Sequence, residues 1–118
     1  MLLPMRRWFI NWIEKYRAAA WVTWAVVVFI LHAFPGEYVP NYSWMELFAI
    51  DKWVHALMFG LGAYIIQFSV RTKLQTAILA LGYAFMLELY QLLLASGRSF
   101  DWLDLLADTV GILLAFLV

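Results

Sequence analysis

The sequence has no cysteine and few charged residues, and each absence excludes a class of protein. Without cysteine, disulfide scaffolds and thiolate metal centres are excluded. Charged residues make up only 14% of the 118 residues, whereas a soluble domain has about 25%. Hydrophobic residues make up 66%, which is more apolar surface than a soluble chain of this length can bury. We therefore expect a single integral membrane domain, whose first partner is the lipid bilayer.

Four long apolar stretches account for most of the chain, at residues 18–36, 53–70, about 74–96 and about 102–118. Each holds roughly 17–23 residues, the length that a helix needs to cross a hydrocarbon core about 30 Å thick. A helix also satisfies its own backbone hydrogen bonds in lipid, which an isolated strand cannot do. We predict an all-α integral membrane protein with an antiparallel bundle of four transmembrane helices, forming one domain over residues 18–118.

The first 17 residues predict a different kind of helix. Aromatic and aliphatic side chains recur at helical spacing on one face, namely Trp8, Phe9, Trp12, Ile13 and Tyr16. Charged side chains fill the other face, namely Arg6, Arg7, Glu14, Lys15 and Arg17. This pattern is typical of an amphipathic helix that lies in the membrane interface. A cleaved signal peptide is disfavoured, because no small-x-small cleavage motif follows.

The basic residues are distributed unequally between the two predicted sides of the membrane, although the formal net charge is zero. Six belong to the N-terminal segment and to the connection between the second and third stretches: Arg6, Arg7, Lys15, Arg17, Arg71 and Lys73. Only Lys52 and Arg98 lie on the other side. Because cytoplasmic loops carry the excess of lysine and arginine, we predict that both termini are cytoplasmic and that residues 35–51 and 97–101 face outward. The balanced charge gives no reason to expect a nucleic-acid partner.

This topology places polar residues of three helices at one depth, in the outer half of the bundle. The predicted ligand-binding set is Asp51, Lys52, His55, Glu88, Gln91, Arg98, Asp101, Asp104 and Asp108. An ionised carboxylate near the middle of a transmembrane helix costs about 2.5–3.5 kcal/mol, so we expect Glu88 and Asp108 to face the interior. The set then lines an outward-facing polar cavity. His32 lies at a similar depth on the first helix and is interpreted as structural.

The predicted cavity has five carboxylates but only two basic side chains, an excess of three negative charges. Raised carboxylate pKa values, a protonated His55, a divalent cation or a cationic ligand would each offset this excess, and the sequence leaves all four open. Helix capping is an alternative explanation for Asp51 and Asp101, since aspartate is a preferred N-cap residue. It explains Asp108 poorly, because Asp108 lies two turns inside its helix.

The order and spacing of these residues resemble the VanZ-like family of small bacterial membrane proteins. The pattern is Asp51-Lys52-x-x-His55, then Glu88-x-x-Gln91, then Gly97-Arg98-x-x-Asp101-x-x-Asp104-x-x-x-Asp108-x-x-Gly111, and it covers about residues 50–115. The resemblance implies the bacterial cytoplasmic membrane and a role in the cell envelope, since the family is named for a member linked to low-level teicoplanin resistance. Asparagine is usual at the position of Asp108, so the present site is more acidic than the family pattern.

Two classes of function fit this set. In the first, which the resemblance favours, a non-enzymatic envelope protein binds a lipid-linked wall intermediate or a glycopeptide, with Lys52 and Arg98 contacting phosphate or carboxylate groups. In the second, a membrane-embedded hydrolase or transferase uses a divalent metal ion on a lipid-linked or cell-wall substrate. Its candidate metal ligands are His55, Glu88, Asp104 and Asp108, and its candidate catalytic residues are His55, Glu88 and Asp108. A proton-coupled transporter using Glu88 is disfavoured, because the polar groups cluster at one face.

Overall fold

The computed structural model describes residues 2–34, 42–44, 49–94 and 100–118. These ranges contain no strand, and their helices are α1 (Leu2–Lys15), α2 (Arg17–Ala33), α4 (Ile50–Ile66), α5 (Lys73–Leu93) and α6 (Trp102–Ala115). The predicted all-α class is confirmed for these residues. Helices α2, α4, α5 and α6 each coincide, to within a few residues, with one of the four predicted apolar stretches.

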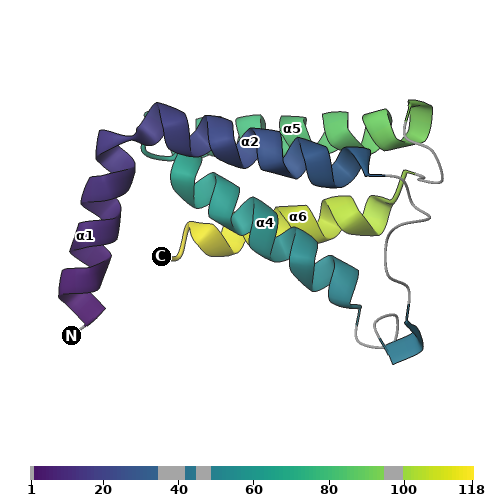
Figure 1. Ribbon diagram of the computed structural model, residues 1–118, viewed down its shortest axis with the longest axis horizontal. Coiled ribbons are helices and arrows are strands. Elements are labelled where there is room, and N and C mark those ends of the chain that lie inside the picture. The colour runs from purple at the N-terminus through teal and green to yellow at the C-terminus, as the bar shows by residue number, and fades with distance from the viewer. Residues whose placement is uncertain (1, 35–41, 45–48, 95–99) are drawn as a thin grey trace.

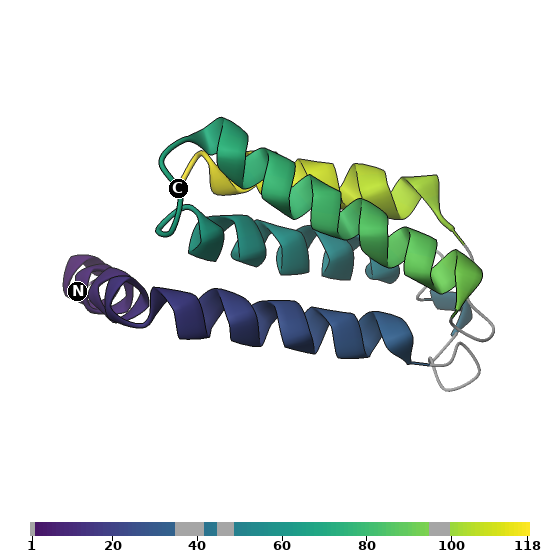
Figure 2. The ribbon, with the colours of Figure 1, turned by 90° about the horizontal axis from the view of Figure 1, so that it is seen from above.

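Helices α2, α4, α5 and α6 run in alternating directions and pack side by side as an antiparallel bundle (Figures 1 and 2). One end of the bundle therefore gathers the C-terminal ends of α2 and α5 and the N-terminal ends of α4 and α6. The opposite end gathers the other four helix termini and the C-terminus of the chain (Figure 1). Helix α1 turns away from α2 by 88° next to Tyr16, so it lies across the axis of the bundle at this opposite end.

Local sequence sets where two of these helices begin. Thr72 forms a capping box at the start of α5: its Oγ1 accepts from the Gln75 amide at 3.1 Å, and Gln75 Oε1 accepts from the Thr72 amide at 3.2 Å. Asp101 caps α6 through its Oδ1, which accepts from the Leu103 amide at 2.9 Å. Both caps satisfy amides that the first turn of a helix leaves without an intrahelical partner.

Helices α4 and α6 pack backbone against backbone. A Cβ atom on Gly111 would lie 2.0 Å from the Ala56 carbonyl oxygen, and one on Gly60 would lie 3.0 Å from the Gly111 carbonyl oxygen. At Gly111 only glycine fits such a close approach. On another face of α4, the Trp24 indole of α2 donates to the Met58 carbonyl oxygen at 2.9 Å. Helix α4 is thus held against both α2 and α6.

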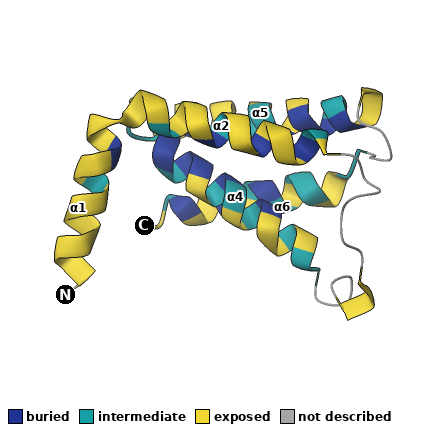
Figure 3. Cartoon of the chain, in the orientation of Figure 1, coloured by how far each residue is buried: buried dark blue, intermediate teal, exposed yellow. Residues whose placement is uncertain are grey.

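The bundle has a largely apolar core, but much of the outer surface of its helices is exposed (Figure 3) and that surface is also apolar. Large apolar residues are exposed on every helix of the bundle, for example Leu57 (72%), Leu74 (70%) and Leu106 (60%). The interior also includes buried polar side chains, namely His32, His55, Thr76, Glu88, Gln91 and Asp108. Extended apolar surface of this kind marks contact with lipid or with another apolar partner.

Length and composition clearly qualify one described helix to cross a membrane, the 21-residue α5. Helices α1 and α2 pass the same test only together, as a bent pair. Helices α2 and α4 have 17 residues each and α6 has 14, at or below the lower limit of about 17 residues for a membrane span. A membrane-crossing helix is therefore supported, while the crossing of the membrane by all four bundle helices stays a prediction.

Candidate functional site

The predicted site residues gather at the end of the bundle where α4 and α6 begin. We call this the acidic end, and its residues are Asp51, Lys52 and His55 of α4, Glu88 and Gln91 of α5, and Asp101, Asp104 and Asp108 of α6 and its cap. Arg98 lies outside the described residues. Three helices that are distant in sequence thus contribute to one cluster.

Lys52 lies among three carboxylates. Its Nζ is 2.6 Å from Asp51 Oδ2, 2.8 Å from Asp101 Oδ2 and 2.6 Å from Asp104 Oδ1. Three ion pairs thus offset the cost of partly burying this ammonium. The ammonium is neutralised within the protein, which makes it a weak group for binding a ligand phosphate. Asp51 does not cap its helix, because the N-cap residue of α4 is Ala49.

Asp101 connects three helices. Its Oδ1 caps α6, its Oδ2 binds Lys52 of α4, and its backbone N–H donates to Glu88 Oε2 of α5 at 2.9 Å. Burial raises the pKa of Asp101, but Lys52 and the Leu103 amide outweigh it and hold that pKa below its ordinary value. Capping and ion pairing, which the sequence leaves as alternatives, therefore operate together at this residue.

His55 and Asp108 form a buried pair between α4 and α6. His55 Nδ1 lies 2.8 Å from Asp108 Oδ1, and His55 Nε2 lies 3.5 Å from Asp104 Oδ2. The second oxygen of Asp108, Oδ2, has no hydrogen-bond partner among the described residues, and the same is true of Glu88 Oε1. A buried polar atom without a partner costs about 1–3 kcal/mol. Both oxygens are therefore suited to binding a proton, a water molecule or a cation.

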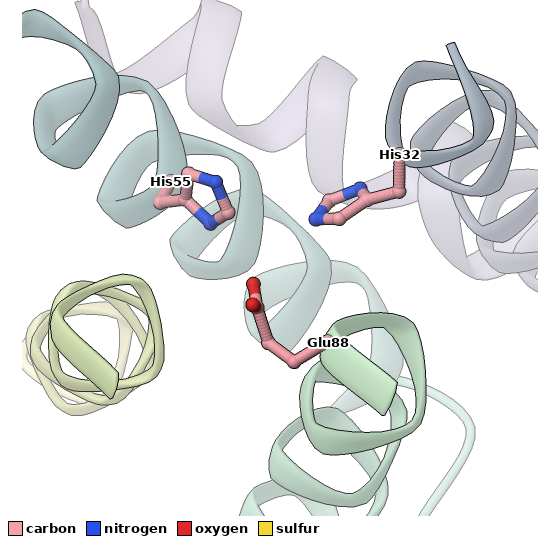
Figure 4. Close-up of side chains that lie close together, drawn as sticks. All are labelled: His32, His55 and Glu88. Carbon is pink, nitrogen blue, oxygen red and sulfur yellow. The ribbon is translucent and has the colours of Figure 1, made fainter. Parts of the chain in front are cut away.

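His32 joins the cluster from α2. Its ring lies 5.3 Å from the His55 ring at an angle of 84°, and its Nδ1 is 2.8 Å from the Val28 carbonyl oxygen. Gln91 Nε2 donates to the His32 carbonyl oxygen at 3.2 Å, which ties α5 to α2 at this depth. Figure 4 shows the side chains of His32, His55 and Glu88 directed toward one another from three helices. The sequence interpretation treats His32 as structural, and its depth, similar to that of His55, is the signal that it faces the same cluster.

Two groups of side chains bring possible metal-ligand atoms together. One ligand atom from each member lies within 4.8 Å of the others, in the first group for His32, His55 and Glu88. The second group consists of Asp51, Asp101 and Asp104. Its centre already holds the Lys52 ammonium. The four predicted metal ligands therefore do not form one group. His55 and Glu88 lie together with His32. Asp104 instead binds Lys52, and Asp108 contacts His55 Nδ1.

The described part of the cluster is strongly acidic, with five carboxylates and one lysine. Its exposed edge is formed by Asp51 and Asp101, whose side chains are 61% and 38% exposed. Two surface hollows of the described chain lie elsewhere, on residues 2–9 of α1 and around residues 69–79, so the predicted polar cavity stays a prediction. The excess of negative charge suits a cationic group or a metal ion better than an anion.

Comparison with known proteins assigns the chain to a family. The family model described as VanZ/LLP1 matches residues 3–118, and the chain therefore belongs to this family. The resemblance predicted from the motif over about residues 50–115 is confirmed, and the match extends it to α1 and α2. No curated protein matches the chain, and no solved structure matches it.

Proposed function

We propose that this member of the VanZ/LLP1 family is a multi-span protein of the bacterial cytoplasmic membrane that binds an envelope ligand at its acidic end. The ligand is amphipathic, either a lipid-linked wall intermediate or a glycopeptide. The observation that carries the proposal is that large apolar residues are exposed along the helices while the carboxylates gather at one end of the bundle. Figure 3 shows how much of each helix is exposed. Such a molecule is suited to a ligand with an apolar tail and a polar head.

In this proposal all four bundle helices span the bilayer. At 1.5 Å per residue, the 17 residues of α2 and of α4 extend about 26 Å, a few ångströms less than a core of about 30 Å. A mismatch of this size costs fractions of a kcal/mol per ångström and is met by local thinning of the bilayer. The 14-residue α6 is shorter still, so we expect the bilayer to be thinnest beside it.

The basic residues support one orientation. Six of them lie on α1, on α2 and around the turn into α5, at the end of the bundle opposite the acidic end (Figure 1). We call this the basic end, and its residues are Arg6, Arg7, Lys15, Arg17, Arg71 and Lys73. The positive-inside rule places it in the cytoplasm together with both termini. Helix α1, which crosses the bundle axis, then lies in the inner interface, and the acidic end faces outward.

The exposure of the carboxylates falls from the surface to the interior of the acidic end. The side chains of Asp51, Asp101, Asp104 and Asp108 are 61%, 38%, 13% and 1% exposed. A ligand therefore meets Asp51 and Asp101 first. Because Lys52 is already paired, these carboxylates favour a ligand with an ammonium group, or a phosphate-bearing ligand that arrives with a divalent ion.

Single cysteines test the orientation, because the chain has no cysteine of its own. Ser43→Cys and Ser69→Cys form a matched pair, since both serines are exposed. Ser43 belongs to the segment 42–44, which lies toward the acidic end, and Ser69 belongs to the connection from α4 to α5 at the basic end (Figure 1). We expect a membrane-impermeant maleimide to label the Ser43→Cys protein on intact cells and the Ser69→Cys protein only after permeabilisation. Labelling of the Ser69→Cys protein on intact cells would contradict the proposed orientation.

Ligand binding is tested on purified protein in lipid nanodiscs, with a fluorescent polyprenyl-diphosphate wall precursor and with teicoplanin as probes. We expect saturable binding of at least one probe, and about tenfold weaker binding by Asp51→Asn, equivalent to about 1.4 kcal/mol. Asp51 is chosen because its side chain is exposed and does not cap a helix. Glu14→Gln on the exposed side of α1 is the control and should bind like the wild type. Absence of saturable binding, or an equal loss in both variants, would contradict the proposal.

A second candidate function is a metal-dependent hydrolase or transferase that acts on the same class of ligand. It is favoured by one observation, that the predicted metal ligands His55 and Glu88 lie beside a second histidine. An enzyme should release product from the polyprenyl-diphosphate probe and lose this activity in Glu88→Gln and on addition of a chelator. Binding at the exposed edge, by contrast, should survive Glu88→Gln, because Glu88 is buried.

A further inference from the structure

The interior of the acidic end holds three metal-ligand side chains from three different helices. His32, His55 and Glu88 are 2%, 8% and 0% exposed, and one ligand atom of each lies within 4.8 Å of the other two (Figure 4). We infer that these three side chains bind a single divalent metal ion of the zinc class. The ion lies deeper than the edge proposed to meet the envelope ligand, and its binding does not require that ligand.

In both imidazoles the hydrogen bond made by Nδ1 leaves Nε2 as the nitrogen that can bind a metal ion. His32 Nδ1 lies 2.8 Å from the Val28 carbonyl oxygen, which can only accept, so this nitrogen carries the proton of the neutral ring. His55 Nδ1 lies 2.8 Å from Asp108 Oδ1 and donates to it in the same way. Nε2 is then the nitrogen with the lone pair in both rings. A bond from Nδ1–H to a carbonyl or a carboxylate is the usual outer support of a histidine metal ligand.

Glu88 supplies the third ligand atom. Its Oε2 accepts from the Asp101 amide at 2.9 Å, whereas its Oε1 is buried and has no hydrogen-bond partner within the described part of the chain. A bound cation would remove the cost of that arrangement, which is about 1–3 kcal/mol or more for a charged group. Asp104 adds to the attraction, because its Oδ2 lies 3.5 Å from His55 Nε2. The negative charge around the three ligands therefore favours a dication.

The ligand types select the class of metal. Two imidazole nitrogens and one carboxylate oxygen are typical of catalytic zinc sites, which keep a fourth position for water or substrate. Mg²⁺ and Ca²⁺ prefer oxygen ligands throughout. Zinc-to-ligand distances of about 2.0–2.1 Å place tetrahedral ligands about 3.3 Å apart. The present separations are within 4.8 Å, so each must shorten by no more than about 1.5 Å to complete the site.

The second carboxylate group provides an internal control. Asp51, Asp101 and Asp104 also lie close together, but Lys52 Nζ is 2.6–2.8 Å from an oxygen of each. The lysine takes the place of a cation there, so we expect no metal ion at this group. Asp51→Asn should leave metal binding unchanged, although it is expected to weaken binding of the envelope ligand.

Cobalt titration tests the metal site. The full-length protein is purified in mild detergent, stripped with a chelator and titrated with Co²⁺, whose visible absorption reports its ligands, and Zn²⁺ is then added as a competitor. We expect one equivalent of Co²⁺ to bind and to be displaced by Zn²⁺. The affinity should fall at least about tenfold in each of His32→Gln, His55→Gln and Glu88→Gln. Glu14→Gln, the same chemical change as Glu88→Gln at an exposed position, should bind like the wild type.

Either of two results would overturn the inference: a wild-type protein that binds no stoichiometric Co²⁺ or Zn²⁺, or wild-type affinity in all three ligand variants. The wild-type titration by itself decides whether a metal ion binds, and the ligand variants, compared where their thermal unfolding matches that of the wild type, decide where it binds. Asp108→Asn supplies a milder test, since it alters only the support of His55 and should weaken binding about 10–100-fold. A failure of metal binding alone rejects the metal site, and a failure of envelope-probe binding alone rejects the proposed function.

Discussion

At the acidic end of the bundle the charged side chains bind one another, whereas at the basic end they are exposed. Lys52 contacts three carboxylates from α4 and α6, while Arg17, Arg71 and Lys73 are all exposed. The chain therefore uses charge in two ways. One network fixes helices and ligand groups in place, and the other charges suit contact with lipid headgroups and water.

The two ends also differ in what packs between the helices. Toward the basic end the interior is built mainly from alanine and isoleucine side chains, such as Ala63, Ala80 and Ile66. Toward the acidic end it contains the polar side chains of His32, His55 and other members of the cluster. In lipid, helices associate through close packing of small residues and through interhelical hydrogen bonds. The polar contacts are confined to the acidic end, whereas the close packing of Gly111 against Ala56 begins beside them at His55.

The largest effect is expected from breaking the contact through which α4 and α6 join the two ends. In Gly111→Ala the new Cβ would lie 2.0 Å from the Ala56 carbonyl oxygen, which is backbone and cannot rotate away. We expect the free energy of unfolding in detergent to fall by about 3 kcal/mol or more. The matched control is Gly82→Ala, whose added Cβ meets no described atom within 4 Å. It should be neutral or stabilising by up to about 1 kcal/mol, and equal stability of both variants would contradict the packing.

A smaller effect is expected from removing the cation of the acidic end. Lys52→Met leaves three carboxylates without their shared partner and should lower the free energy of unfolding by about 1–3 kcal/mol, since Lys52 is only partly buried. Lys73→Met, the same change at the exposed basic end, should stay within about 0.5 kcal/mol of the wild type. The double variant Lys52→Met/Asp104→Asn should recover part of the loss. Equal effects of the two single lysine variants in chemical unfolding would argue against the contrast between the ends.

The pH dependence of stability sharpens the same contrast. The pKa of Asp101 is lowered, so its contribution is present above about pH 3.9 and is lost as the pH falls through the folded-state pKa. Lys52 is the ion-pair partner of Asp101, at 2.8 Å, so this contribution depends on Lys52. We expect the difference in Tm between the wild type and Lys52→Met to be present at pH 7 and to shrink in acid, as Asp101 is protonated. Absence of a Tm difference at pH 7 would contradict this assignment.

The smallest change in stability is expected at the basic end. Arg71→Gln/Lys73→Gln removes two exposed charges and should change the free energy of unfolding by no more than about 0.5 kcal/mol. Its effect should instead be on orientation, because these residues contribute to the predicted cytoplasmic excess of positive charge. In the Ser69→Cys background, we expect the fraction labelled on intact cells to rise. A large loss of stability with unchanged labelling would show that these side chains act in folding rather than in orientation.

The sequence was sufficient to locate the bundle helices, because an apolar run depends on local composition alone. The charge-free stretch begins only at residue 53, but Asp51 was expected at the start of this helix, and α4 does begin at Ile50 and includes Asp51 and Lys52. Those residues, Asp51 and Lys52, remain helical because their side chains bind each other and α6. Helix boundaries here depend on tertiary contacts that no local pattern contains.

The grouping of the acidic residues on α6 was also predictable, because steps of three and four residues place Asp101, Asp104 and Asp108 along one helix face. The partners of these aspartates were not predictable from the sequence, since the position of Lys52 among them depends on how α4 packs against α6. His32 is the clearest case. Whether it faces His55 depends on the rotation of α2 about its own axis, which contacts such as that of Trp24 with Met58 help to set.

The backbone contact between Gly111 and Ala56 has a mechanical consequence. Two helices that touch with no side chain between them cannot slide without losing that contact, so we expect α4 and α6 to move as one rigid body. His55 and Asp108 then keep their spacing of 2.8 Å during any motion of the bundle. Helix α2 touches this body through the large rings of Trp24 and Phe59, so rocking of α2 changes the distance between His32 and His55. Helices α4 and α6 would then form a fixed pair, against which α2 moves. A group bound between His32 and His55 would set the distance between α2 and this pair.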